Sequence, residues 1–370
     1  MPLPIRPNVL AMQPYSPGKP IDEVKRELGL TEVVKLASNE NPLGPSPKAV
    51  AAVQAAASQM HIYPDASAFA VTQAISSTFG IGPEHIMLGN GSDELIHMLG
   101  QILLSEGDEM IVGDPSFVRY DAAAYLTGTK LIKVPVDAEL RLDLEAMLAA
   151  VTDRTKIIWI ANPNNPTGTI ARRAQFEHLL DRLPGSVVVV LDEAYYDFAA
   201  EDPDYPNSLD YIKAGRENAV GLRTFSKAYG LAGIRLGFGF APAAIVDAFH
   251  RAREPFNCNS LAQVAAVAAL GDTEHLQRTI AVNREGRERL EAALRELGAS
   301  PVESFANFVV ANMGQEAHPI FEALLRQGVI VRSGRGLGLP NHLRISVGTP
   351  DEMTALIGAL RAILASPVNS

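Results

Sequence analysis

Short apolar runs alternate with longer segments of helical periodicity through the first two thirds of the chain. The runs read HIMLG, EMIVG, KIIWIAN and VVVVL, and each has the length of one strand. Segments such as GSDELIHMLGQILLS and ARRAQFEHLLDRL, which have a helical pattern, follow them. Uninterrupted apolar runs are typical of strands that are buried on both faces. The pattern therefore predicts an α/β fold with a mainly parallel sheet covered by helices.

The pattern changes after about residue 256. A helical stretch rich in alanine and charged residues covers roughly 259–297, and short strands, a helix and a terminal helix over 351–365 follow it. This order predicts a smaller α+β domain. We therefore divide the sequence into a large domain over 37–255 and a small C-terminal domain over 256–370.

The first 36 residues read as an arm and one short helix that packs on the small domain. The helix is IDEVKRELG, which Gly29 closes. Proline restricts the backbone and lacks an N–H donor, so the prolines before this helix predict a segment without regular structure. These prolines are Pro4, Pro7, Pro14, Pro17 and Pro20.

Composition narrows the classes of function. A chain of 370 residues is long for one core, and its formal charge of −10 argues against a nucleic-acid partner. The single cysteine, Cys258, excludes an internal disulfide and fits a reducing compartment. We see no Cys/His cluster with metal-ligand spacing, no apolar run of membrane length and no signal-peptide core. The sequence predicts a soluble, cytoplasmic protein with no metal, nucleic-acid or membrane partner.

Polar residues follow the predicted strands, where open α/β sheets bind their ligands. GNGSDE, which contains Ser92 and Asp93, combines glycines with a helix start, and the N–H groups there suit a phosphate. The alternative is a plain helix cap in which Ser92 or Asp93 satisfies its own helix. Asn165 lies in NPNNPTG, which is either part of a site or simply a tight turn.

Asp192 and Lys227 are stronger candidates for residues of a functional site. Asp192 directly follows an apolar strand, which is costly without a cation partner, although a capping or surface aspartate is the alternative. Lys227 lies eight residues before Arg235 in SKAYGLAGIR. A lysine whose pKa is depressed near another cation acts as a nucleophile and a general base, whereas most loop lysines are merely solvated. Arg235 has the planar fork that grips a phosphate.

Together these motifs resemble those of the fold-type I pyridoxal-phosphate enzymes, in particular the histidinol-phosphate aminotransferase family. The resemblance covers essentially the whole chain. The matching motifs are PYSPGKP (14–20), KLASNENPLGPSP (35–47), YPD (63–65), GNGSDE (89–94), NPNNPTG (162–168), DEAY (192–195), SKAYGLAGIRLGF (226–238) and LRISVGTPDE (343–352). The family implies a mainly parallel, seven-stranded-type sheet in a large domain that binds the cofactor, pyridoxal 5′-phosphate.

The resemblance also implies roles for individual residues. Lys227 would bind the cofactor aldehyde covalently and move the proton between the substrate and the cofactor. Asp192 would pair with the ring nitrogen, and Asn165 and Tyr195 would bind the ring hydroxyl group. Phe117 would stack on the ring, where many relatives carry tyrosine. The residues implied around the cofactor phosphate are Ser92, Asp93, Thr224, Ser226, Arg235 and, from the neighbouring subunit of a homodimer, Tyr63.

For the substrate, the resemblance implies Arg344 first, then Arg332, with Asn41 and Tyr15. Histidinol phosphate has no carboxylate whereas glutamate has two, so one pocket must accept a phosphate and a carboxylate in turn. Bidentate arginines bind both groups. Arg335 lies in the glycine-rich SGRGLGLP, which we interpret as a mobile substrate loop rather than a nucleotide loop.

The implied reaction converts imidazole-acetol phosphate and L-glutamate into L-histidinol phosphate and 2-oxoglutarate. Its partners are thus a small amino donor and a 2-oxo acid. An aromatic amino acid aminotransferase is the alternative within this class. A lyase similar to the threonine-phosphate decarboxylases is the alternative from another class, and a non-catalytic sensor that binds the cofactor is a third.

Overall fold

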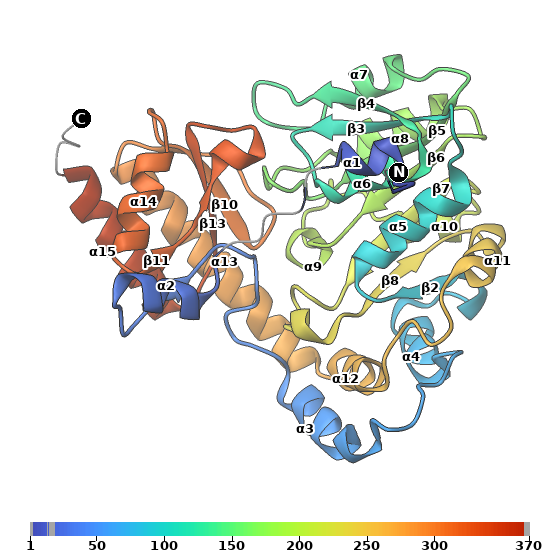
Figure 1. The fold of residues 1–370 in the computed structure, drawn as a ribbon, viewed down its shortest axis with the longest axis horizontal. Coiled ribbons are helices and arrows are strands. Elements are labelled where there is room, and N and C mark those ends of the chain that lie inside the picture. The colour runs from blue at the N-terminus through green and yellow to red at the C-terminus, as the bar shows by residue number, and fades with distance from the viewer. Residues whose placement is uncertain (1–2, 13, 15–18, 366–370) are drawn as a thin grey trace.

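The computed structural model describes residues 3–12, 14 and 19–365, and it has two lobes of unequal size (Figure 1). The larger lobe contains a seven-stranded sheet in the order β2-β8-β7-β6-β5-β3-β4. Only β8 runs antiparallel to its two neighbours, and the other pairs are parallel. The strands are β2 (Ile86–Gly89), β3 (Glu109–Asp114), β4 (Lys130–Pro135), β5 (Thr155–Ala161), β6 (Val188–Asp192), β7 (Ala219–Thr224) and β8 (Gly237–Phe240). The predicted mainly parallel α/β sheet is confirmed.

Alternate side chains of the central strands pack on opposite faces of this sheet. On β5, Ile157 and Trp159 belong to one buried cluster, and Ile158 and Ile160 belong to the other. The first cluster includes α5 (Ser92–Leu103), α6 (Arg119–Thr127) and α11 (Ala243–Ala252). The second includes α3 (Pro47–Ala56), α4 (Phe69–Phe79), α7 (Leu144–Ala149), α8 (Arg173–Arg182), α10 (Ser208–Lys213) and α12 (Ser260–Leu270). Strands buried on both faces explain the continuous apolar runs of the sequence.

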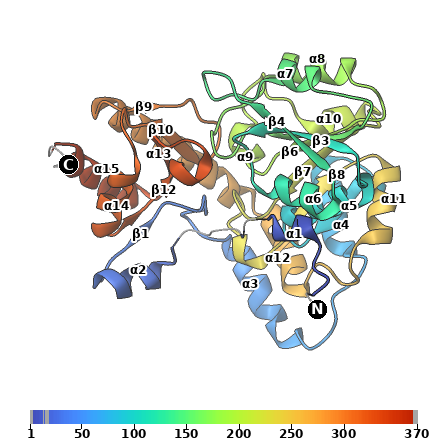
Figure 2. The same ribbon diagram turned by 45° about the horizontal axis from the view of Figure 1, so that its top comes forward.

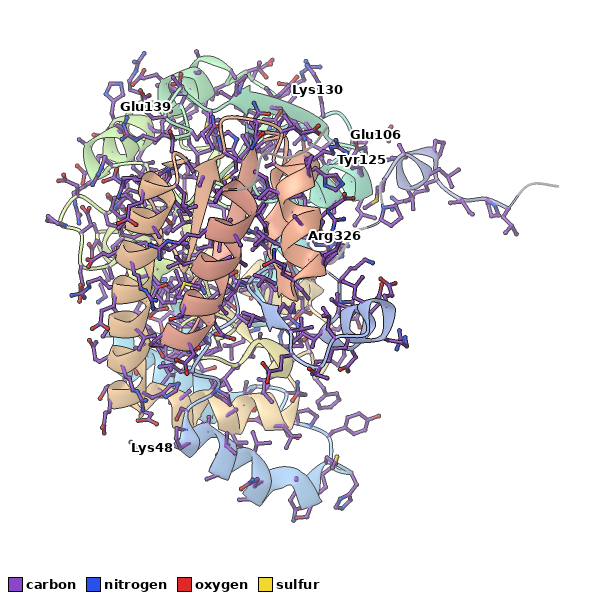
Figure 3. The ribbon with its side chains drawn as sticks, turned by 90° about the vertical axis from the view of Figure 1, so that its left-hand side faces the viewer. Lys48, Glu106, Tyr125, Lys130, Glu139 and Arg326 are labelled. Atoms are coloured by element: carbon purple, nitrogen blue, oxygen red, sulfur yellow. The ribbon has the colours of Figure 1, made fainter. Side chains whose placement is uncertain are left out.

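The smaller lobe is an antiparallel sheet in the order β12-β13-β10-β9 with helices on its outer face. Its strands are β9 (Ser300–Pro301), β10 (Phe308–Asn312), β12 (Arg332–Ser333) and β13 (His342–Ser346). Its helices are α13 (Thr273–Glu296), α14 (His318–Arg326) and α15 (Pro350–Ala365), which face the viewer in Figure 3, where Arg326 marks α14. The other face of the sheet, with Phe308 and Val310, packs against Tyr195 of the larger lobe.

The N-terminal segment joins both lobes. Helix α2 (Ile21–Leu28) ends at Gly29, whose φ of 67° only glycine adopts readily. Its buried Val24 packs against Ile330 of the smaller lobe, where β1 (Val34–Lys35) pairs in parallel with β11 (Val329–Ile330). Helix α1 (Pro7–Leu10) lies instead on α6 of the larger lobe (Figure 2).

The expected absence of regular structure before α2 was wrong at α1. Pro7 occupies the first turn of this helix, where its missing N–H has no partner to lose and its fixed φ suits the helix. The long helical stretch predicted after residue 259 is two helices, α12 and α13, which are separated at Gly271 and Asp272. Because α12 packs on α3, it shares the core of the larger sheet. The domain boundaries that we drew along the sequence stay predictions.

Shorter elements complete the described chain. They are α9 (Tyr196–Ala199) and the 3-10 turns η1 (Ala57–Gln59), η2 (Pro83–His85), η3 (Ala232–Ile234) and η4 (Gly334–Leu337). Among the described residues, no helix combines the length and the apolar character needed to cross a membrane.

Candidate active site

A cavity of about 550 Å³ lies where the carboxyl ends of the central strands face the smaller sheet. Asp192 ends β6, Thr224 ends β7, and both line it. The smaller lobe contributes Arg332 and Arg344, and η4 contributes Gly336. This placement follows the rule that open α/β sheets bind ligands beyond their strand ends.

The cavity gathers most of the residues that the sequence pointed to. Those that line it are Ser92, Asp93, Phe117, Asn165, Asp192, Tyr195, Thr224, Ser226, Lys227, Arg235, Arg332 and Arg344. They come from loops and strand ends that lie far apart along the chain, and the sheet brings them together. Their individual roles stay predictions.

Lys227 extends into the cavity from the loop after β7. Its Nζ donates to the Ser38 carbonyl at 3.3 Å and lies 5.7 Å from the centre of the Tyr195 ring. Burial, and then the positive charge of Arg344, lower the pKa of Lys227 to about 8. A larger fraction of this amine is therefore unprotonated near neutral pH than for an exposed lysine, which suits a nucleophile and a general base.

One end of the cavity has the chemistry of a phosphate site. Helix α5 begins there at Ser92, and its cap residue, Gly91, has no side chain to satisfy the first N–H groups. A Cβ on Gly91 would lie 2.4 Å from the Arg235 guanidinium, so glycine allows this close approach. Arg235 also donates to the Ser226 hydroxyl at 3.4 Å. Backbone N–H groups, a hydroxyl and a guanidinium thus surround the same space.

Asp93 brings a negative charge to this end, and two arginines accompany it. Its carboxylate lies 3.5 Å from Arg235 and 3.9 Å from Arg119. Acidic residues in the first turn of a helix are favoured by the helix dipole. Because the two guanidiniums outnumber the one carboxylate, this region suits an anion.

Asp192 lies on the floor of the cavity and is buried. Tyr120 donates from its hydroxyl to Oδ2 at 2.8 Å, and the Ala194 N–H donates to Oδ1 at 3.1 Å. Burial raises the pKa of Asp192 to about 6, although the Tyr120 hydrogen bond opposes this shift. A cationic ligand group beside this carboxylate would compensate the cost of its burial.

A chain of hydrogen bonds joins the two lobes across the cavity. Arg344 donates to Asn165 Oδ1 at 2.7 Å, and Asn165 Nδ2 donates to the Tyr195 hydroxyl at 3.2 Å. Asn39 Nδ2 donates to the same hydroxyl at 3.0 Å. Asn39 has a φ of 56° and also bonds Ser346 on β13. The groups that we assigned to the ring hydroxyl and to the substrate therefore contact one another.

Two arginines face the cavity from the smaller sheet. Arg332 and Arg344 are directly opposite each other on the antiparallel strands β12 and β13, so their side chains share one face. Leu343 and Ile345, on either side of Arg344, point into the other face of the sheet. This alternation delivers two guanidiniums to one wall, where a phosphate or a carboxylate can bind.

Two of the predicted residues lie elsewhere, and a third is not among the described residues. Asn41 is buried outside the cavity lining, and its amide donates to the Ala228 carbonyl and to the Thr279 hydroxyl. Tyr63 does not line this cavity either, because its ring is 79% exposed and stacks on Phe256. Tyr15 lies outside the described residues. The substrate roles of Asn41 and Tyr15 and the phosphate role of Tyr63 stay predictions.

The glycine-rich segment around Arg335 forms η4 at the mouth of the cavity. Gly336 and Leu337 line the cavity, whereas Arg335 is mainly exposed and pairs with Glu316. Its mobility stays a prediction.

Sequence reasoning missed Tyr120, Asn39 and Arg119. Tyr120 reads as an ordinary apolar position of a helix, and its contact with Asp192 spans 72 residues. Asn39 stands two residues before Asn41 in SNENP, and the pattern gave no reason to choose between them. Arg119 directly precedes Tyr120 in DPSFVRY, a motif in which we noted only Phe117.

The donor set fits pyridoxal 5′-phosphate. The uncapped start of α5 with Arg235 suits its phosphate, the buried Asp192 suits a ring cation, and the amine of Lys227 suits its aldehyde. Within the described part of the chain, no group of three or more His, Cys, Asp or Glu side chains is arranged to hold a metal ion.

Comparisons with known proteins agree with this geometry. The sequence profile of the family "Aminotransferase class I and II" matches residues 31–360. The histidinol-phosphate aminotransferase of Moorella thermoacetica is 48% identical over 97% of this chain and 93% of its own length. Histidinol-phosphate aminotransferase 2 of Carboxydothermus hydrogenoformans is 44% identical over 97% of this chain and 99% of its own length.

The fold comparison gives the same result. The crystal structure of histidinol-phosphate aminotransferase from Sinorhizobium meliloti in complex with pyridoxal-5′-phosphate superposes with a TM-score of 0.90. The two sequences are 28% identical, and the match covers 99% of this chain and 98% of that one. This chain thus shares its overall fold with a protein whose structure contains this cofactor.

Proposed function

The chain belongs to the class I and II aminotransferase family, and on that premise we propose that it interconverts L-histidinol phosphate and imidazole-acetol phosphate, with 2-oxoglutarate and L-glutamate as the other pair. The observation that carries this choice of substrates is the pair of arginines, Arg332 and Arg344, on one wall of the cavity that contains Lys227. One anion site of this kind accepts the phosphate of one substrate and a carboxylate of the other in turn.

The cofactor supplies the part of the chemistry that side chains lack. When bound, pyridoxal 5′-phosphate provides an aldehyde that takes up the amino group and a ring that accepts electrons from the substrate α-carbon. The N–H groups of α5, with Ser226 and Arg235, would hold its phosphate. Asp192 would hold a proton at its ring nitrogen, because a buried carboxylate favours a cationic neighbour.

Lys227 moves the protons in this proposal. With its pKa lowered to about 8, the amine exists partly in the neutral form that attacks an aldehyde and accepts the proton of the substrate α-carbon. Tyr195 and Asn165, which contact each other, would bind the ring hydroxyl. Arg344, hydrogen-bonded to Asn165, would orient the substrate so that its α-carbon faces Lys227.

The active unit in this proposal is a homodimer. Tyr63 and Phe256 are exposed and stack on each other, and Met60, Ile62 and Phe69, close to Tyr63 along the chain, are also exposed, from which we infer an exposed apolar patch. Such patches mark interaction surfaces. A partner subunit that covers this patch would receive Tyr63 at the phosphate end of its own cavity.

The direct test is a transamination assay with the purified enzyme and its cofactor. Histidinol phosphate and 2-oxoglutarate together should yield glutamate, and omission of either substrate should stop its formation. Lys227→Ala should abolish turnover while the protein still binds the cofactor through Asp192 and Arg235. Normal turnover in Lys227→Ala would refute the role of the lysine, and no glutamate from the wild-type enzyme would refute the substrates.

A further inference from the structure

Tyr120 lies directly behind Asp192 and outside the lining of the cavity. It is fully buried in α6, and its hydroxyl lies 2.8 Å from Asp192 Oδ2. The ring stacks on Trp159, with centres 4.9 Å apart and planes 14° apart. Phe117, which lines the cavity, packs edge-on against the Tyr120 ring, and the two ring centres are 5.7 Å apart. The tyrosine is therefore held in one orientation between the core and the cavity wall.

The hydroxyl of Tyr120 is a permanent donor. Burial, and then the charge of Asp192, raise the pKa of Tyr120 well above its ordinary value, so the O–H keeps its proton. The other donor to Asp192 is the Ala194 N–H. Both donors are neutral, and hydrogen bonds from neutral donors to a carboxylate favour its charged form without cancelling its charge.

We propose that Tyr120 is a positioning residue for the transamination site, which keeps the Asp192 carboxylate charged and aimed at the ring nitrogen of the bound cofactor. The proposal rests on the proposed function only in so far as pyridoxal 5′-phosphate is the ligand of the cavity. It does not depend on which amino acid the enzyme uses.

The alternative to this role is that Tyr120 contributes packing alone. Tyr120→Phe separates the two, because phenylalanine keeps the ring against Trp159 and Phe117 and removes only the hydroxyl. Without this donor the proton affinity of Asp192 rises, and the proton shared with the ring nitrogen shifts toward the carboxyl group. A packing role predicts no such shift.

The first measurement compares two ligands of the apoenzyme. One is pyridoxal 5′-phosphate, and the other is its analogue in which a C–H group replaces the ring nitrogen. Tyr120→Phe should weaken binding of the natural cofactor about tenfold, the low end of the effect of a lost hydrogen bond to a charged group. Binding of the analogue should stay within about twofold of that of the wild-type enzyme, because it offers Asp192 no nitrogen.

The matched control is Tyr211→Phe. Tyr211 is also largely buried, and its hydroxyl donates to a carboxylate, Glu177 Oε1, at 3.3 Å, but it lies on α10 outside the cavity lining. This variant should bind both ligands as the wild-type enzyme does. Equal weakening of both ligands in Tyr120→Phe would show a packing role and overturn the proposal.

The second measurement locates the proton. In the holoenzyme with the ring nitrogen labelled by ¹⁵N, the nitrogen chemical shift should move toward the unprotonated value in Tyr120→Phe and stay unchanged in Tyr211→Phe. If Tyr120→Phe does not fold, 3-fluorotyrosine at position 120 keeps the shape, strengthens the donor, and should shift the signal toward the protonated value. An unchanged nitrogen signal in a folded variant would overturn the proposal.

The outcomes separate this inference from the proposed function. A wild-type enzyme that binds the cofactor but does not accept histidinol phosphate refutes the substrates and leaves the role of Tyr120 standing. A wild-type enzyme that transaminates histidinol phosphate, with ligand affinities and nitrogen signal insensitive to Tyr120→Phe, refutes the role of Tyr120 alone.

Discussion

Lys227 and Arg344 are two cations on opposite lobes that face one cavity, and the charge of Arg344 affects the ionisation of Lys227. Burial and the charge of Arg344 lower the pKa of Lys227 from its ordinary 10.5 to about 8. Between these two values the unfolded chain binds more protons than the folded chain, so the ionisation of this lysine makes the fold more stable as the pH rises from 8 to 10.5. The same shift supplies the neutral amine that the proposed role of Lys227 requires.

We expect the apoenzyme to react with pyridoxal 5′-phosphate at a rate that rises with pH through about 8. In Arg344→Gln the loss of a nearby positive charge should raise the pKa of Lys227 and move this profile to higher pH. Absorbance of the bound cofactor, recorded after mixing over a series of pH values, measures the rate. A profile that Arg344→Gln leaves in place would show that burial alone sets the pKa.

For single residues, the sequence identified those whose type is unusual at their position in the predicted elements. Asp192 was recognisable because a carboxylate directly after an apolar strand is costly, and Lys227 because its motif is distinctive. Tyr120 was not recognisable, since a buried tyrosine in an apolar helix looks like core. Its hydroxyl gains a role only when the sheet brings α6 against the end of β6.

Strands β6 and β7 are tied together below the site by a buried ion pair. Arg223 Nε donates to Glu193 Oε2 at 2.9 Å, and the two side chains are 4% and 0% exposed. The Ser208 hydroxyl also donates to the Glu193 carboxylate. The Arg223 guanidinium lies 3.4 Å from the centre of the Tyr196 ring. Since Glu193 directly follows Asp192, this pair anchors the strand end that carries Asp192.

Glu193→Ala should lower the free energy of unfolding by about 3–5 kcal/mol, because it leaves the Arg223 charge buried without its partner. Asp247→Ala is the control, since it breaks the exposed pair of Asp247 with Arg251 and should cost less than about 1 kcal/mol. Urea unfolding of the apoenzyme, followed by circular dichroism, gives both values. Similar losses in the two variants would mean that burial adds nothing to the pair.

At the scale of elements, the sequence pattern did not reveal two strands of the larger sheet, β8 and β4. β8 consists of Gly237, Phe238, Gly239 and Phe240, and glycine is unfavourable in strands. The structure needs Gly237 because a Cβ there would lie 2.4 Å from the Ser92 nitrogen, at the start of α5. Most residues of the edge strand β4 are exposed or partly exposed, so this strand lacks the continuous apolar run of the inner strands. The inner strands β3, β5 and β6, by contrast, have such runs and were predicted.

On the scale of the whole molecule, the lobes meet at a cavity that neither could form alone. The sequence predicted two domains from chain length and from the change of pattern near residue 256, whereas α12 shows that the core of the larger sheet extends beyond it. The apolar pattern of the sequence does not indicate a subunit interface, and only the family resemblance implied that Tyr63 reaches a neighbouring subunit. The contact between the exposed rings of Tyr63 and Phe256, which are far apart in the sequence, is visible only in the folded chain.

A homodimer with composite sites predicts complementation. An inactive Tyr63 variant mixed with the inactive Lys227→Ala variant should regain some activity, because one site of each hybrid dimer combines an intact Lys227 with an intact Tyr63. The assay is glutamate formation after subunit exchange, which labelled subunits confirm separately. Exchange without any recovery of activity would contradict the shared site.

The most direct test of the whole account is a half-reaction screen of the enzyme with its cofactor. The enzyme is mixed with L-histidinol phosphate, L-glutamate, L-phenylalanine, L-tyrosine or threonine phosphate, and the absorbance change of the cofactor gives a second-order rate constant for each. The arginine pair of the cavity predicts the largest rate constant for histidinol phosphate and a productive reaction with glutamate. A larger rate constant for phenylalanine or tyrosine, or the release of carbon dioxide from threonine phosphate, would contradict it.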